Sequence, residues 1–142
     1  MRLRRRGVAL VAALAIGAAG AASGAACVPS VRGYALYHGY LQLQASVAAT
    51  EVPLPTSASR CVNCHDAQPS GAPRRVVPLD RTSLVQPVAR RGGPPSTYDA
   101  ASFCAAAREG LDPSFVILDR TMPRFAISDD DCRALWRYVS AR

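Results

Sequence analysis

The stretch Cys61-Val62-Asn63-Cys64-His65 is the most informative part of this 142-residue chain. A Cys-x-x-Cys-His sequence is typical of covalent attachment of c-type haem, in which both thiols bond to the vinyl groups and the histidine ligates iron. One turn of helix gives the two sulfurs the separation of the vinyl groups, and the next residue then directs an imidazole at the metal. The sequence therefore predicts one haem c, attached through Cys61 and Cys64 and ligated by His65.

Two other uses of a Cys-x-x-Cys pair remain open at this point. A zinc site would need further ligands at short spacing, and the only other histidine is His38. A dithiol redox pair would need a βαβ setting, and no strand pattern precedes Cys61. Because His38 lies among tyrosines, we expect it to be a packed helix residue rather than an iron ligand.

Met122 is the candidate for the second axial ligand of the iron. It is the only methionine apart from the initiator, and it follows His65 by 57 residues in the loop Thr121-Met122-Pro123. A thioether is a soft, weakly donating ligand that favours ferrous iron. A methionine that only fills the core is the alternative, but the Cys-x-x-Cys-His sequence upstream favours ligation.

The N-terminus has the pattern of a secretory signal peptide. Four arginines precede an apolar run and then small residues, so we expect residues 1–26 to be cleaved and residues 27–142 to form one domain. Cys27 follows directly and is a candidate for lipidation, although Gly24 stands where a lipobox usually has leucine. A free or removed Cys27 is the alternative. The protein is expected to be exported to a bacterial periplasm, and to be tethered to a membrane only if Cys27 is lipidated.

The charge of the chain does not indicate a nucleic-acid-binding protein. The formal charge of +7 falls to about +3 without the signal peptide, and basic residues do not alternate with aromatic ones. Five arginines of the mature chain are candidates for steering an acidic partner: Arg74, Arg75, Arg90, Arg91 and Arg124.

Hydrophobic periodicity predicts three helices separated by irregular segments, and therefore an all-α fold. The first helix is expected over Gly33–Leu43, with a stripe of Tyr34, Tyr37 and Leu41. Prolines and small polar residues predict loops over 46–60, from after His65 to Pro78, and over 90–95. A backbone carbonyl near Pro73 or Pro78 in the second loop is expected to accept a hydrogen bond from the outer nitrogen of His65.

The other two helices lie near the end of the chain. Ser96 is expected to cap one that ends at Gly110, with Asp99 three residues after the cap. The last is expected to begin at Ser128, where three aspartates favour the positive end of the helix dipole. Cys104 and Cys132 fall on the core-facing sides of these helices, and in an oxidising compartment a disulfide between them is expected. Two buried thiols are the alternative.

The whole arrangement resembles the class I c-type cytochromes, in particular small bacterial monohaem members. The resemblance covers residues 33 to 142 and rests on Gly33-x-x-Leu36-Tyr37, the Cys-x-x-Cys-His sequence, the Met-Pro loop, and a closing helix with Trp136 and Tyr138. It implies a cytochrome c-like fold, with helices wrapped around one covalently bound haem and long irregular loops. It also implies that His65 is the proximal and Met122 the distal iron ligand. About fifteen loop residues separate the first helix from Cys61, whereas compact members have almost none.

The expected function is electron transfer between periplasmic or membrane-bound redox proteins, not enzymatic catalysis. With both axial positions filled, iron does not readily bind a substrate. The expected partners are a redox protein that donates electrons and another that accepts them. In one variant of this hypothesis, the chain is a subunit of a larger respiratory or dehydrogenase complex. A five-coordinate haem subunit that binds a gas or takes part in catalysis is the alternative. A haem-containing structural subunit of a larger redox complex is another.

Overall fold

A computed structural model describes residues 30–48, 50–66 and 76–142. The signal peptide, Cys27, Arg74 and Arg75 lie outside these residues, so the predictions for them stay predictions. In chain order the elements are α1 (Val31–His38), β1 (Gln44–Ser46), α2 (Val62–His65), α3 (Arg81–Val85), β2 (Val88–Ala89), β3 (Pro95–Ser96), α4 (Ala100–Glu109), β4 (Arg124–Ala126) and α5 (Asp129–Val139). Within the described residues, no helix has both the length and the apolar character needed to cross a membrane.

Helix α1 is shorter than predicted. Ser30 caps its start by accepting a hydrogen bond from the Gly33 amide at 3.1 Å. It ends at Gly39, whose φ of 78° lies in the left-handed region that glycine adopts without strain. The residues that α1 buries are Gly33, Leu36 and Tyr37. The predicted extension to Leu43 and the Tyr34–Tyr37–Leu41 stripe are therefore wrong, and Tyr34 is exposed.

Helix α4 begins later than expected, and its cap is a different residue. Asp99 is the N-cap and forms a reciprocal capping box with Ser102, whereas Ser96 belongs to β3. The predicted end at Gly110 is confirmed. Asp99 and Ser102 have the same three-residue spacing as Ser96 and Asp99, so the capping pattern alone did not distinguish the two starts.

Helix α5 matches the prediction from sequence closely. Ser128 is its N-cap and accepts a hydrogen bond from the Asp131 amide, and three aspartates occupy the first turn. Cys132, Leu135 and Val139 are buried on one face. The structure joins Cys132 to Cys104 of α4 through a disulfide with a Cα–Cα distance of 5.9 Å, in agreement with the prediction.

Two short antiparallel sheets accompany the helices, and neither was predicted from the sequence. Strand β1 pairs with β4 so that Ala45 lies opposite Phe125, and β2 pairs with β3. Helices provide most of the core, and two small sheets accompany them in the described part of the chain. The loop predicted over 46–60 is irregular apart from the end of β1 and contains no helix within its described residues.

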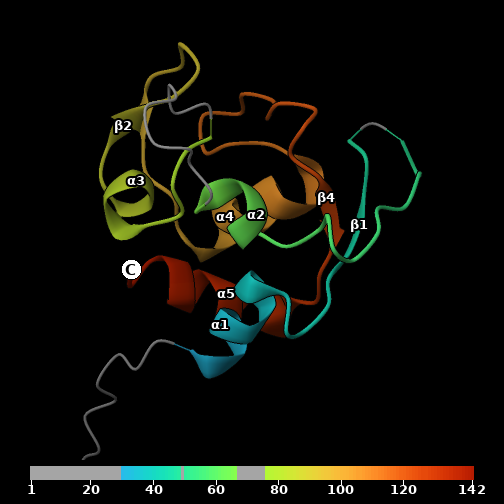
Figure 1. Cartoon of the computed structure of the whole chain (residues 1–142). Coiled ribbons are helices and arrows are strands. Elements are labelled where there is room, and N and C mark those ends of the chain that lie inside the picture. The colour runs from blue at the N-terminus through green and yellow to red at the C-terminus, as the bar shows by residue number, and fades with distance from the viewer. Residues whose placement is uncertain (1–29, 49, 67–75) are drawn as a thin grey trace, which may run out of the picture.

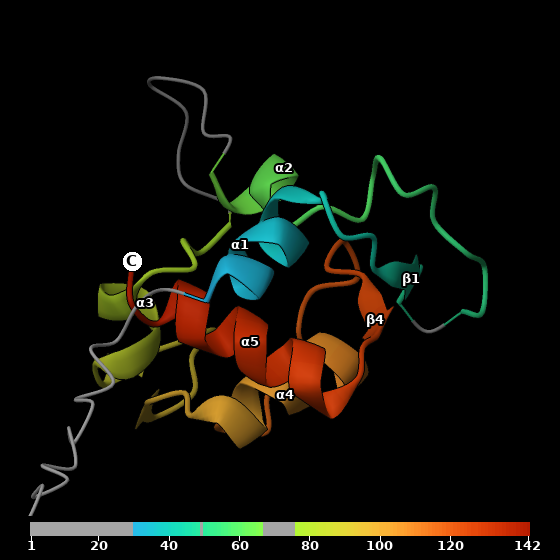
Figure 2. The same ribbon diagram turned by 90° about the horizontal axis from the view of Figure 1, so that it is seen from below.

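Helices α1 and α5 lie against each other, and α2 lies beside α1 (Figure 2). Figure 1 shows α3 and the β1–β4 sheet on opposite sides of α2. The α1–α5 contact is close at Gly33, because a Cβ atom there would overlap the Ala134 carbonyl and lie 2.7 Å from the Cβ of Tyr138. On the other face of α5, the Trp136 ring lies 5.5 Å from the Phe103 ring of α4.

Gly33→Ala is expected to lower the free energy of unfolding by about 1–3 kcal/mol, because the added methyl group would force α1 away from α5. Chemical denaturation measures the change. Val31→Ala is the matched control, since Val31 is 79% exposed on the same helix and should change stability little. Equal stability of the glycine variant and wild type would contradict the close packing.

Replacing both Cys104 and Cys132 with alanine is expected to lower stability by about 3–4 kcal/mol, since the disulfide joins residues 28 positions apart. Denaturation of the double variant, and of wild type in reductant, measures the loss. Alkylation of these two thiols in denatured protein before any reduction would show that the bridge does not form.

Candidate functional site

The Cys-x-x-Cys-His sequence forms one helical turn, as predicted. Cys61 is the N-cap residue of α2, and its carbonyl accepts hydrogen bonds from the amides of Cys64 at 3.2 Å and His65 at 3.0 Å. Neither Cys61 nor Cys64 takes part in a disulfide. The turn therefore presents two free thiols and an imidazole from one short segment, with Cys61 half-buried and Cys64 exposed.

The His65 ring is held by a backbone carbonyl. Its Nδ1 atom lies 2.7 Å from the Val77 carbonyl oxygen, and because a carbonyl only accepts, Nδ1 carries the proton. Val77 precedes Pro78, so the expectation of a carbonyl partner near Pro73 or Pro78 is confirmed on the Pro78 side. The arrangement leaves the Nε2 lone pair available to a metal.

Burial favours the neutral forms of the His65 imidazole and the Cys61 thiol. It lowers the pKa of His65, and the hydrogen bond to Val77 only partly opposes this effect. Burial also raises the pKa of the Cys61 thiol to about 12. Dithiol redox centres use a cysteine whose pKa is lowered, so the environment of Cys61 does not favour that alternative. Among the described residues there is no group of three or more His, Cys, Asp or Glu side chains placed to hold a metal ion.

Asp66, which follows His65 directly, is bound by two distant parts of the chain. The buried Tyr37 hydroxyl donates to its Oδ1 atom at 2.7 Å, and the Arg142 guanidinium donates to Oδ1 at 2.9 Å and to Oδ2 at 3.1 Å. Burial alone would raise the pKa of Asp66, but these hydrogen bonds outweigh it and hold the pKa below its ordinary value. We call Tyr37, Asp66 and Arg142 the Asp66 cluster.

The Asp66 cluster was not predicted from the sequence. An acidic residue directly after the histidine was visible, but nothing in the sequence pointed to Arg142, which lies 76 positions further along the chain. Burial raises the pKa of Tyr37, and its hydrogen bond to Asp66 raises it further, so the hydroxyl stays a donor at neutral pH.

Met122 lies in a turn before β4. Its amide donates to the Asp119 carbonyl at 3.0 Å, and its own carbonyl accepts from Arg124 at 2.6 Å. Its side chain is half-buried and packs against the main core, as do those of Leu54, Cys61, Val62 and Leu79. The structure thus places Met122 and Cys61 at the edge of one core, while the pairing of Met122 with His65 across an iron ion stays a prediction.

His38 and Arg90 prove to have local roles. The His38 Nε2 atom lies 3.3 Å from the Tyr138 hydroxyl, and its ring packs among tyrosines, as expected for a packed residue. Arg90 is only 8% exposed, and its guanidinium donates to the carbonyls of Val88, Ser96 and Ser83. The expectation that Arg90 steers a partner is therefore wrong, because its charge is enclosed by carbonyls of its own loop and of α3.

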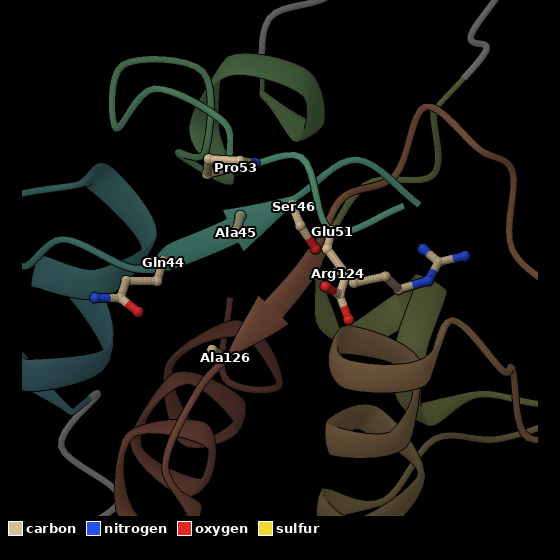
Figure 3. Close-up of a pocket in the computed structure, with 7 residues that line it drawn as sticks. All are labelled: Gln44, Ala45, Ser46, Glu51, Pro53, Arg124 and Ala126. Carbon is tan, nitrogen blue, oxygen red and sulfur yellow. The ribbon is translucent and has the colours of Figure 1, made fainter. Parts of the chain in front are cut away.

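A separate depression of about 200 Å³ lies beside the β1–β4 sheet. Figure 3 shows its lining, with Glu51, Ser46 and Arg124 at one end and Gln44 at the other. None of the predicted haem-binding residues lines it, so this depression is distinct from the site around α2.

Comparisons with models of known protein families, with curated proteins and with solved structures found no match.

Tyr37→Phe is expected to cost about 1–2 kcal/mol of stability, because it removes the hydrogen bond to the Asp66 carboxylate and keeps the buried ring. Urea denaturation measures the loss. Tyr40→Phe is the control, since Tyr40 is 73% exposed and its hydroxyl should contribute little. Similar stability for both variants would mean that the Tyr37 hydroxyl does not support α2.

Proposed function

We propose that this protein is an exported monohaem c-type cytochrome that carries electrons between redox proteins of the periplasm or its membrane. The observation that carries the proposal is the hydrogen bond from His65 Nδ1 to Val77, made beside two free thiols on one helical turn. A histidine held in this way has a fixed tautomer and a fixed ring orientation, as iron-ligating histidines usually have.

The residues around α2 fit a covalently bound haem, which when present supplies one-electron chemistry at iron. Cys61 and Cys64 would hold it through thioether bonds, and His65 would ligate iron through Nε2. Half-buried apolar side chains that pack against the same core as Cys61, including Leu54 and Leu79, offer surface that packs well against a large apolar group.

Met122 is proposed as the second axial ligand. It packs against the same core as Cys61. Its amide donates to the Asp119 carbonyl and its carbonyl accepts from the Arg124 side chain, and these two hydrogen bonds keep the residue in place. A thioether in this position would fill the coordination sphere and raise the reduction potential relative to two histidines. The proposed role is therefore electron transfer, with a donor and an acceptor protein as partners, rather than gas binding or catalysis.

Optical spectroscopy of the holoprotein, produced with c-type maturation, tests this function. Wild type is expected to keep its haem after denaturation and to show, in the ferric state, the weak long-wavelength absorption band of methionine-ligated haem. Met122→Ala is expected to lose that band and to bind carbon monoxide rapidly when reduced, because the sixth position becomes open.

Val85→Ala is the control, since Val85 also packs half-buried against the core but lies in α3. A high-spin wild type that binds carbon monoxide at once would refute the carrier proposal and favour a five-coordinate subunit. A wild type without covalent haem would refute haem attachment altogether.

A further inference from the structure

Asp66 and Arg142 form an ion pair of opposite charges directly beside the predicted iron ligand. We propose that this pair sets the reduction potential of the iron held by His65, with each charge offsetting the effect of the other. This inference rests on the proposed function, and it assigns to two residues outside the haem-binding sequence a role in tuning the site.

Both charges are held in place by several contacts. Asp66 is the C-cap residue of α2, and its carboxylate accepts from Tyr37 and from Arg142. The guanidinium carbon of Arg142 lies 4.6 Å from the centre of the Tyr37 ring and 5.5 Å from that of Tyr138. The Arg142 carbonyl also accepts from the amide of Arg81 at 3.1 Å. Neither charged group is therefore a loosely tethered surface side chain.

The pair is partly shielded from water, so its field reaches the site. The side chains of Arg142 and Asp66 are 29% and 32% exposed, which leaves less screening than at a fully solvated pair. At the His65 ring the two charges act with opposite sign, because the carboxylate favours positive charge there and the guanidinium disfavours it.

The two charges must shift an electron-transfer equilibrium in opposite directions. When one electron passes from a mediator to the site, the positive charge of the site falls by one. Asp66 stabilises the more positive, oxidised state, and Arg142 stabilises the reduced state. Removing the carboxylate should therefore raise the reduction potential, and removing the guanidinium should lower it.

Redox titration of the haem-loaded protein with soluble mediators tests the proposal. Relative to wild type, Asp66→Asn is expected to raise and Arg142→Gln to lower the potential, each by a severalfold change in the equilibrium constant for reduction. The double variant should return towards the wild-type value. Shifts of both single variants in one direction would indicate a merely structural role, and no shift in either would also overturn the proposal.

The Arg108–Asp129 ion pair provides a matched control. It joins the same residue types at 2.6 Å, between the end of α4 and the start of α5, which Figure 2 shows on the other side of the molecule from α2. Arg108→Gln and Asp129→Asn should leave the potential unchanged. If the same shifts appeared in these variants, a general charge effect would replace the specific one.

Charge-conserving variants keep the test valid if a neutral variant does not fold. Arg142→Lys and Asp66→Glu retain the two charges and should keep a potential near that of wild type, even where stability falls. A large shift in these variants would contradict the proposal. Failure of the proposed function is distinguishable, because wild type would then carry no covalent haem and give no potential to compare.

Discussion

The close packing of α1 against α5 at Gly33 is the constraint on which the rest of the structure depends. Because a side chain at this position would overlap the Ala134 carbonyl, the two helices can approach only through glycine. Their approach brings Tyr37 from α1 and Arg142 from the segment after α5 to the same carboxylate, Asp66. The packing of two helices distant in sequence therefore determines where the Cys-x-x-Cys-His turn is held.

Contacts on both sides of His65 fix the orientation of this turn. On one side the Asp66 cluster binds the residue after the histidine, and on the other the Val77 carbonyl binds the imidazole itself. The first contact is electrostatic and the second is made with the backbone, so no single charge change removes both. Such dual support suits a ligand whose ring must keep one orientation while the charge of its metal changes.

Local features of the fold could be predicted from sequence, and features that depend on distant contacts could not. The start and the buried face of α5 followed from Ser128, the three aspartates and the apolar spacing, all within one segment. The helical turn of the Cys-x-x-Cys-His sequence was predictable in the same way, because its residues are adjacent in the chain. By contrast, β1 is three residues long and pairs with a strand about 80 positions away, and Asp66 meets Arg142 only through the tertiary fold. The early end of α1 at Gly39 was missed because glycine inside a periodic pattern is compatible with both continuation and a left-handed cap.

The disulfide and the most deeply buried side chains of the core lie in α4, α5 and α1, whereas the Cys-x-x-Cys-His turn lies at the edge of the core. The disulfide between Cys104 and Cys132 stabilises the α4–α5 side, where Cys132 and Val139 are fully buried. On the α2 side the chain has no such bridge among its described residues, and Cys61 and Met122 are only half-buried. Small domains have little apolar surface to spare, so a side with incomplete burial contributes less to stability. Covalent attachment at Cys61 and Cys64, as proposed, would add a second cross-link and further apolar contacts to the core. The proposed attachment and the Cys104–Cys132 disulfide would thus act on different parts of the same core.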